Sequence, residues 1–230
     1  MSQIVLLGSV FLPATVFGPL ADALAERGHR ARIAGAEHAT TPDEVLDAYL
    51  DAIGDVRGVV GVAHSNAGAY VPALVARGHL DSVVFMDAVL PGPDGGEHQA
   101  VRSDLGDVLR ARVVDGALSR WTEWWPIDQV RSLFPDEPTF ADVHDATPRV
   151  AAEYLDGTVE VPAGWTDGVR GAFLAFGETY ADERRLAASL GWPTRTIDLA
   201  HLGFLQRPNA VARELTALMN GWQAPGSSRT

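Results

Sequence analysis

The stretch of the chain that decides the fold is Val59-Val60-Gly61-Val62-Ala63-His64-Ser65-Asn66-Ala67-Gly68-Ala69-Tyr70. Its valine-rich start is typical of a buried strand, and it ends at a turn of small residues with Ser65 at the centre. Apolar residues then recur with helical spacing. A strand, a tight turn with a serine at its apex and a helix together form a nucleophile elbow, which exposes the serine hydroxyl. The structural alternative is that Ser65 caps a buried helix.

Composition limits the class of protein. The chain has 230 residues, of which 47% are hydrophobic and 21% charged, and this fits one α/β domain with a substantial core. The absence of cysteine excludes disulfides, thiolate metal sites and a cysteine nucleophile. Every basic side chain is an arginine, and the net charge of −12 argues against nucleic acid or an anionic membrane as partner. No apolar run approaches the roughly 18–20 residues of a membrane span, and the N-terminus lacks a signal-peptide pattern, so we expect a cytoplasmic location.

Strand and helix patterns alternate at both ends of the chain. We expect strands over residues 3–8, 29–34, 57–63, 81–89, 169–177 and 194–199, and helices over 17–27, 42–53, 66–77, 181–190 and 208–219. This alternation predicts an α/β fold, with a mostly parallel sheet of about six strands flanked by helices.

The middle of the chain interrupts this alternation. Residues 90–168 contain several prolines, amphipathic helical stretches and a tryptophan cluster. We therefore predict a helical lid over residues 90–168, inserted above the carboxyl edge of the sheet. Residues 1–89 and 169–224 then form the core, and residues 225–230 a flexible tail.

Polar residues that could carry chemistry follow the predicted strands, where sites lie in sheets of this kind. The loop after the last strand holds His201, and histidine ordinarily titrates near neutrality, which suits it to take a proton from a serine hydroxyl. A carboxylate must orient the imidazole, and the loop after the preceding strand offers Glu178, with Asp182 as an alternative. Ser65, Glu178 and His201 follow one another in the chain order of an α/β-hydrolase triad.

Two further motifs support this interpretation. Val84-Phe85-Met86-Asp87-Ala88-Val89-Leu90-Pro91-Gly92 is a strand that ends at a small residue before a Pro-Gly pair, and His201-Leu202-Gly203-Phe204-Leu205-Gln206-Arg207-Pro208 places leucines and a proline after the histidine. With these motifs the chain resembles the α/β-hydrolase superfamily along nearly its whole length. It is most similar to the small esterase and hydroxynitrile-lyase-like branch, which uses no cofactor.

The resemblance implies roles for particular residues. Ser65 would be the nucleophile, His201 the general base and Glu178 the acid. Some members of the superfamily take the acid from the strand end where Asp87 lies, so Asp87 is a third candidate. The oxyanion hole would come from the backbone amide of Asn66 and from one in the first loop, at Val10 or Phe11.

These residues predict a serine hydrolase that cleaves a carboxylic ester, thioester or lactone of a small, largely apolar substrate through an acyl-enzyme. Candidate pocket residues are Ser9, Trp121, Trp124 and Trp125, although such aromatic residues also suit the lid's own small core. We expect no cofactor, no metal site and a small molecule as the partner; a homodimer is compatible with the sequence. The arginine-, alanine- and glycine-rich composition suggests a bacterial source.

Two departures from the family pattern keep other functions open. The chain has Gly8-Ser9 where the family usually has His-Gly, and Ala63 and Ala67 flank the nucleophile where glycines are common. A lyase or isomerase that uses the same pocket is one alternative. A catalytically silent ligand-binding protein is the other.

Overall fold

A six-stranded sheet forms the centre of the computed structural model, which describes residues 1–222 apart from the side chain of Asp104. The strand order is β10-β9-β4-β3-β1-β2, and every neighbouring pair is parallel. The strands are β1 (Gln3–Leu7), β2 (Arg30–Ala34), β3 (Val59–Ser65), β4 (Ser82–Ala88), β9 (Arg170–Phe176) and β10 (Thr194–Ile197). The predicted α/β fold with a parallel sheet is confirmed.

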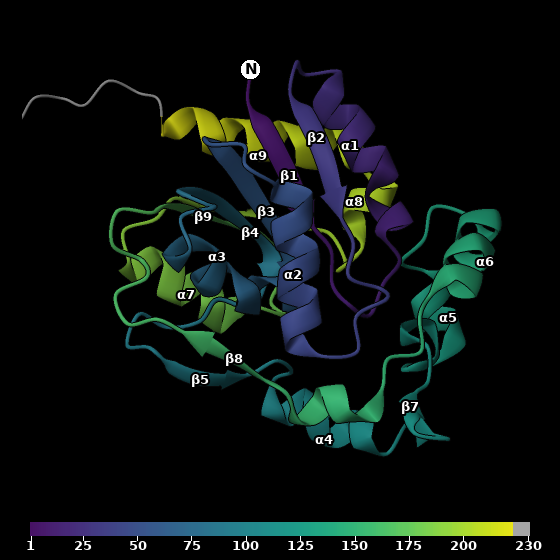
Figure 1. Ribbon diagram of the computed structural model, residues 1–230. Helices are drawn as coiled ribbons and strands as arrows, with labels where there is room; N and C mark the ends of the chain where they lie inside the picture. Colours follow the sequence, from purple (N-terminus) through teal and green to yellow (C-terminus); the bar gives the residue numbers. More distant parts are fainter. Residues whose placement is uncertain (223–230) are drawn as a thin grey trace, which may run out of the picture.

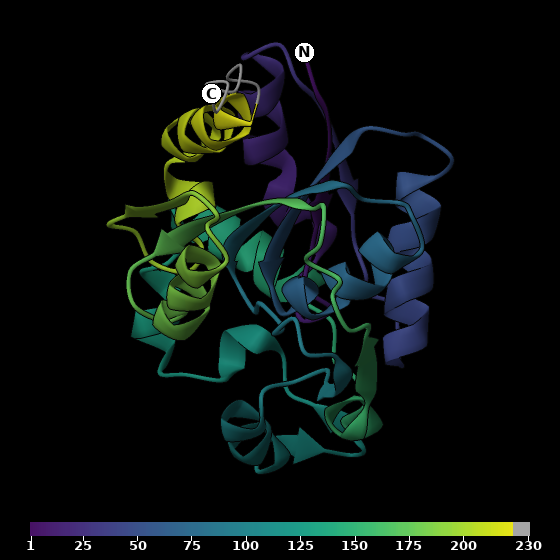
Figure 2. The ribbon, with the colours of Figure 1, turned by 90° about the vertical axis from the view of Figure 1, so that its left-hand side faces the viewer.

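Helices cover both faces of the sheet. On one face α1 (Gly18–Ala25) packs beside α9 (Pro208–Gly221), and on the other α2 (Pro42–Ile53) lies beside α3 (Val71–Ala76) (Figures 1 and 2). The remaining helices of the core are α7 (Ala181–Ser189) and α8 (Gly203–Gln206), with the 3-10 segments η1 (Ala14–Phe17) and η2 (Asn66–Tyr70).

Local sequence explains two of these helix starts. A capping box begins α2: the Thr41 hydroxyl accepts from the amide of Glu44, whose carboxylate accepts from the amide of Thr41. The helix expected over residues 66–77 is divided into η2 and α3. Because Pro72 has no N–H, the carbonyl of Gly68 is bonded by the amide of Val71, in 3-10 fashion.

Residues 90–168, which we call the cap, connect β4 to β9, and their helices lie beside the ends of the strands (Figure 1). They hold α4 (Ser103–Arg110), α5 (Ile127–Arg131), α6 (Glu137–Ala146), η3 (Trp121–Glu123) and η4 (Ala152–Asp156). Two small antiparallel sheets were not expected in a helical lid: β5 (Gly96–Gln99) pairs with β8 (Thr158–Val161), and β6 (Val113–Val114) with β7 (Ala117–Leu118). The first pair joins the two ends of the cap. Residues 223 and 224 of the predicted core and the predicted tail 225–230 lie outside the described residues.

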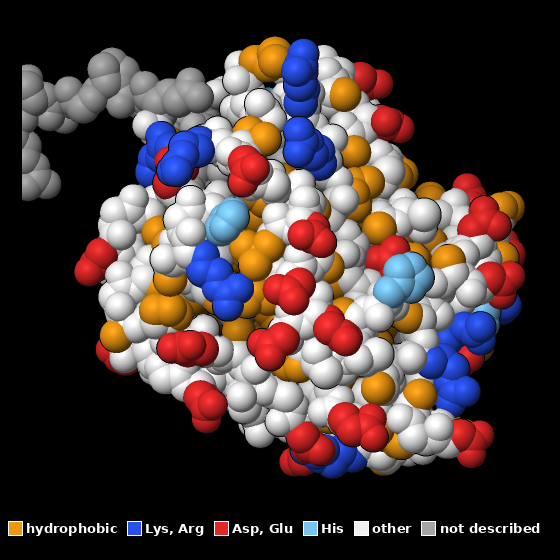
Figure 3. Space-filling model, viewed as in Figure 1, with side chains coloured by type: hydrophobic (Ala, Val, Ile, Leu, Met, Phe, Trp, Pro, Cys, Tyr) orange, Lys and Arg blue, Asp and Glu red, His pale blue; other side chains and the backbone are white. Residues whose placement is uncertain are grey.

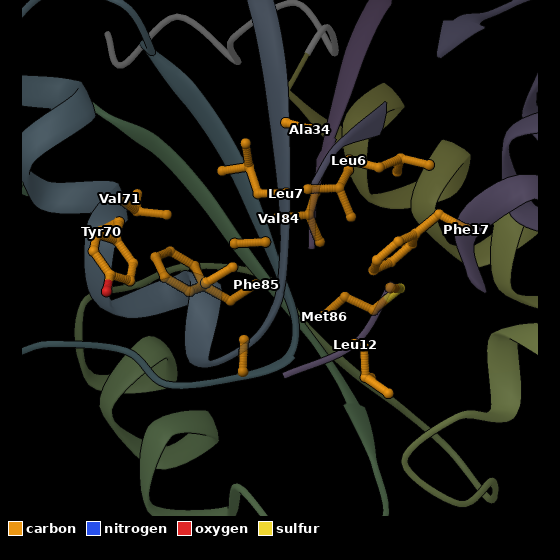
Figure 4. Packing of buried hydrophobic residues seen from close by; sticks show 14 of the residues in the cluster. Leu6, Leu7, Leu12, Phe17, Ala34, Tyr70, Val71, Val84, Phe85 and Met86 are labelled. Carbon is orange, nitrogen blue, oxygen red and sulfur yellow. The ribbon is translucent and has the colours of Figure 1, made fainter. Parts of the chain in front are cut away.

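The core lies on both faces of the central strands. Phe85 and Met86, successive residues of β4, point to opposite sides of the sheet and are both fully buried (Figure 4). Phe17 stacks on Phe204 with ring centroids 4.9 Å apart, which packs η1 against α8. Asp and Glu side chains are spread over the face in Figure 3, and the net charge of the chain is −12. Among the described helices, none has both the length and the apolar character of a membrane span.

Candidate active site

Ser65 lies at the sharp turn between β3 and η2. Its φ of 58° and ψ of −129° fall outside the regions that residues with a side chain prefer. The pairing with β4 also shifts here, because His64 is opposite Met86 but Ser65 is opposite Ala88. A Cβ atom at Gly68 would lie 1.9 Å from the carbonyl oxygen of Val89, so the turn requires glycine at that position.

The two alanines that depart from the family pattern fit this turn. Ala63 and Ala67 are both fully buried. The close approach of η2 to the end of β4 falls at Gly68, so the elbow forms without a glycine on either side of Ser65.

His201 is held by a buried carboxylate. Its Nδ1 lies 2.7 Å from Oδ2 of Asp87, the residue before the end of β4. The other oxygen of Asp87 accepts from the backbone amide of Phe176 at 2.9 Å. Two hydrogen bonds thus compensate for burying the carboxylate. A neutral imidazole that donates from Nδ1 presents Nε2 as an acceptor.

The loop after β1 supplies backbone amides near the site. The amide of Phe11 donates to the Ser9 hydroxyl at 3.3 Å, so both groups are engaged within the loop. The amide of Val10 has no hydrogen-bond partner among the described residues. Asn66 opens η2, and the first amides of a helix have no partner inside it. Val10 and Asn66 are therefore the stronger candidates for an oxyanion hole.

A buried network fixes the residue that follows Ser65. The Asn66 side-chain amide donates to the carbonyl of Ala100 in the cap at 2.6 Å, and the Tyr154 hydroxyl lies 3.5 Å from Asn66 Oδ1. The hydroxyls of Tyr70 and Tyr154 are 2.5 Å apart. Burial raises the pKa of Tyr154 to about 12. Nearby, Tyr49 donates to the carbonyl of Gly8 at 2.6 Å, which anchors the loop after β1.

A cavity of about 440 Å³ lies where the cap meets the strand ends. Ser65 and His201 share its wall with the predicted pocket residues Trp121, Trp124 and Trp125 and with Phe11. Phe11 and Trp124 meet edge to face at 4.9 Å, and Trp121 meets Trp125 at 5.3 Å. The predicted pocket residue Ser9 is buried away from this cavity.

Comparison with protein-family models and with curated proteins finds no match. Solved structures do match. An extracellular α/β-hydrolase from a Paenibacillus species, described as homologous in structure and function to tobacco salicylic acid binding protein 2, superposes with a TM-score of 0.72 at 15% identity, over 95% of this chain and 99% of that one. The chain has the α/β-hydrolase fold. The pyrethroid hydrolase PytH superposes with a TM-score of 0.72 at 13% identity, over 98% of this chain and 100% of its own. Polyneuridine aldehyde esterase superposes with a TM-score of 0.68 at 15% identity, over 95% of this chain and 99% of its own.

In this α/β-hydrolase fold the structure corrects the expected contact between Glu178 and His201. The Glu178 carboxylate pairs with Arg184 at 3.2 Å and is 74% exposed. The alternative, Asp182, pairs with Arg185 and is 83% exposed. Gly177, with φ of 78°, turns the chain into the start of α7, where both carboxylates face solvent. Of the three candidates, Asp87 is the one that contacts His201.

Two further residues at the site, Tyr180 and His64, were not among the predicted site residues. The Tyr180 hydroxyl lies 3.4 Å from Ser65 Oγ, and Tyr180 lines the cavity. No hydrogen bond joins Ser65 to His201 in the described part of the chain. The sequence signal that could have identified Tyr180 is its position in the loop after a predicted strand, two residues beyond Glu178.

The second is His64, which has no exposed surface. Its Nε2 lies 3.1 Å from the carbonyl oxygen of His201, and the two rings stack with centroids 4.4 Å apart. Burial, with the neighbouring His201, lowers the pKa of His64 well below its usual range. The neutral ring then donates from Nε2 to this carbonyl. Successive side chains of a strand point to opposite faces, so the position of His64 next to Ser65 gave no sign of its contact with the backbone of His201.

Proposed function

We propose that this chain is a serine hydrolase that cleaves a carboxylic ester, thioester or lactone through an acyl-enzyme. The observation that carries the proposal is the meeting of three groups from distant parts of the chain. Ser65, with its strained backbone, ends β3, and it lies near the hydrogen-bonded pair of Asp87, near the end of β4, and His201, after β10. The side chains of Ser65 and His201 line the same cavity.

Each residue then has a defined role. Ser65 Oγ attacks the carbonyl carbon while Nε2 of His201 takes its proton, and Asp87 stabilises the resulting imidazolium. The amides of Val10 and Asn66 would hold the oxyanion; one such donor is typically worth about 10²–10³ in rate. Ser65 must rotate from Tyr180 toward His201 for this step. Catalytic hydrogen bonds commonly tighten only when substrate is bound.

The cavity favours an apolar or aromatic acyl or alcohol group. Aromatic and aliphatic side chains make up most of its lining, and its volume of about 440 Å³ suits a small organic molecule. The solved structures with the same fold include proteins described as a pyrethroid hydrolase and as polyneuridine aldehyde esterase, which supports ester cleavage.

The test is a panel of p-nitrophenyl esters, from acetate to octanoate, together with a fluorophosphonate probe. We expect wild type to hydrolyse some of the esters and to be labelled at Ser65. Activity should fall to background in Ser65→Ala and in His201→Ala, and labelling should vanish in Ser65→Ala. A wild-type protein that is inert and unlabelled would overturn the proposal.

A second candidate rests on the contact between Ser65 and Tyr180. A serine hydroxyl that bonds a tyrosine instead of the histidine also suits proton transfer without an acyl-enzyme, as in a lyase. The absence of a covalent acyl-enzyme by mass spectrometry, in a protein that still converts substrate, would favour this candidate.

A further inference from the structure

Tyr180 brings a second proton donor to the reacting atoms. Its ring is 8% exposed and lines the cavity, and among the described residues its hydroxyl has one hydrogen-bond partner, Ser65 Oγ at 3.4 Å. The ring also lies against that of His201, with centroids 5.9 Å apart and planes inclined by 29°. Tyr180 therefore contacts both the proposed nucleophile and the proposed base. The mechanism proposed above assigns its hydroxyl no role.

The order of the strands places Tyr180 on a definite side of Ser65. Ser65 ends β3, which lies between β1 and β4. The loop with Val10 follows β1, on one side. Asp87 lies one residue before the end of β4, Tyr180 follows β9 and His201 follows β10, all on the other side.

This arrangement decides which substrate oxygen Tyr180 can reach. In the tetrahedral intermediate on Ser65, the oxyanion points toward the amides of Val10 and Asn66. The leaving oxygen points toward His201, because Nε2 must give it a proton. Tyr180 lies on this second side, so its hydroxyl faces the leaving oxygen rather than the oxyanion.

We propose that Tyr180 is a catalytic residue that donates a hydrogen bond to the leaving oxygen of the substrate. This inference rests on the proposed ester hydrolysis. As the bond between the carbonyl carbon and the leaving oxygen breaks, its electron pair passes to that oxygen. The proton taken from Ser65 passes from His201 Nε2 to the same oxygen, and Tyr180 keeps its own proton.

The protonation state of Tyr180 is consistent with a donor role. Burial raises the pKa of its hydroxyl above the ordinary value for tyrosine, so the group remains protonated wherever the histidine base is functional. The hydroxyl therefore has a hydrogen to donate throughout the working pH range.

The test compares Tyr180→Phe with wild type on acetate esters whose leaving groups run from p-nitrophenol through phenol to simple alcohols. A donor to the leaving oxygen matters most when that oxygen becomes a strong base. We therefore expect kcat/KM to fall about 10- to 100-fold for alkyl esters and less than about threefold for p-nitrophenyl acetate. The plot of log kcat/KM against leaving-group pKa becomes steeper in the variant.

Tyr70→Phe is the matched control. It removes a buried tyrosine hydroxyl that bonds Tyr154 and lies outside the cavity lining. We expect it to change kcat/KM for all esters by one common factor. Thermal unfolding of each variant checks that the fold persists.

Three outcomes would overturn the proposal: an equal loss for all esters in Tyr180→Phe, no loss at all, or a steeper slope in Tyr70→Phe as well. Failure of the underlying hydrolase function is seen separately. In that case wild type hydrolyses none of the esters and the fluorophosphonate probe leaves Ser65 unlabelled.

Discussion

Ser65 and Asp87 both have positive φ, 58° and 47°, although neither is glycine. Such a conformation costs about 1–3 kcal/mol at each residue and persists where the surroundings over-determine it. Here the surroundings are hydrogen bonds: the amide of Val89 donates to the carbonyl of Ser65 at 3.0 Å, and the amide of Phe176 donates to the carboxylate of Asp87. Strain therefore falls on the proposed nucleophile and the proposed acid. The third described residue of this kind, Asp115, lies in the turn between β6 and β7.

At the residue scale, replacing the acid separates the three candidates. Asp87→Asn keeps the shape of the side chain but removes the charge that stabilises the imidazolium, so kcat on p-nitrophenyl acetate should fall by about 10²–10⁴. Glu178→Gln and Asp182→Asn should stay within about twofold of wild type, because surface ion pairs contribute little. Loss of activity in Glu178→Gln with retention in Asp87→Asn would contradict the geometry.

His64 predicts a pH dependence of stability. Its pKa is lower in the folded protein than the ordinary value of about 6.5 in the unfolded chain, so the unfolded chain takes up the proton first. The contribution of the neutral ring is full above about pH 6.5 and is lost as the pH falls, by up to about 1.4 kcal/mol per pH unit.

The check is the free energy of unfolding between pH 7.5 and 5, by urea titration, for wild type and His64→Gln. Glutamine cannot titrate in this range, so the variant should lose less stability on acidification. The pKa of His29 is also lowered by burial. The variant His29→Gln measures how much of the loss of stability at low pH comes from His29. Equal slopes in wild type and His64→Gln would rule out the predicted role of His64.

At the scale of elements, η2 and η4 are joined by the hydroxyl of Tyr154. It lies 3.3 Å from Asn66 Nδ2 and 2.5 Å from the Tyr70 hydroxyl, and all three side chains are buried. The cap is thereby attached to the residue that follows Ser65. Rigid support of this kind would keep the proposed oxyanion donor in position.

Tyr154→Phe should therefore weaken both stability and catalysis. Without the Tyr154 hydroxyl, the buried Asn66 Oδ1 and Tyr70 hydroxyl lose a hydrogen-bond partner, which costs about 1–3 kcal/mol in the free energy of unfolding. Because the amide of Asn66 becomes less well placed, kcat should fall while KM changes little. Urea unfolding and steady-state kinetics check the two effects, and unchanged kcat would mean that the network serves stability alone.

At the scale of the whole molecule, the cavity exists because the cap meets the carboxyl ends of the strands. The core supplies Ser65, Tyr180 and His201, and the cap supplies the tryptophans. Trp125 is the most exposed of these, at 41%, while it packs against Trp121 and Trp124. It lines the cavity without being part of the buried core.

Trp125→Ala should therefore affect binding more than folding. An aromatic pair contributes about 0.5–1.5 kcal/mol, so KM for aryl esters should rise roughly 2- to 10-fold. The melting temperature should change little, because the side chain is already partly in water. Equal KM values for wild type and variant would show that substrate does not rest on this ring.

Much of this could be predicted from local sequence patterns. The strands, the capping box at Thr41, the elbow at Ser65 and the loop with His201 depend on neighbours a few residues apart, which a sequence displays directly. The parallel sheet followed from the alternation of these elements. Within the cap the patterns indicated helices, but the short pair of β5 and β8 joins residues far apart in the chain and left no local signal.

The sequence by itself determined the fold class, the elbow and the histidine loop. Only the tertiary structure showed that Asp87, and neither Glu178 nor Asp182, contacts His201, and only it revealed Tyr180 beside Ser65. The physical reason is distance along the chain: Asp87 and His201 are 114 residues apart, and Ser65 and Tyr180 are 115 apart. Both carboxylates lie near the carboxyl end of a strand, Asp87 in β4 and Glu178 two residues after β9. The turn at Gly177 directs the chain away from the sheet, and Glu178 pairs with Arg184. Which carboxylate turns inward depends on how β4, β9 and β10 lie side by side, and that arrangement exists only in the folded sheet.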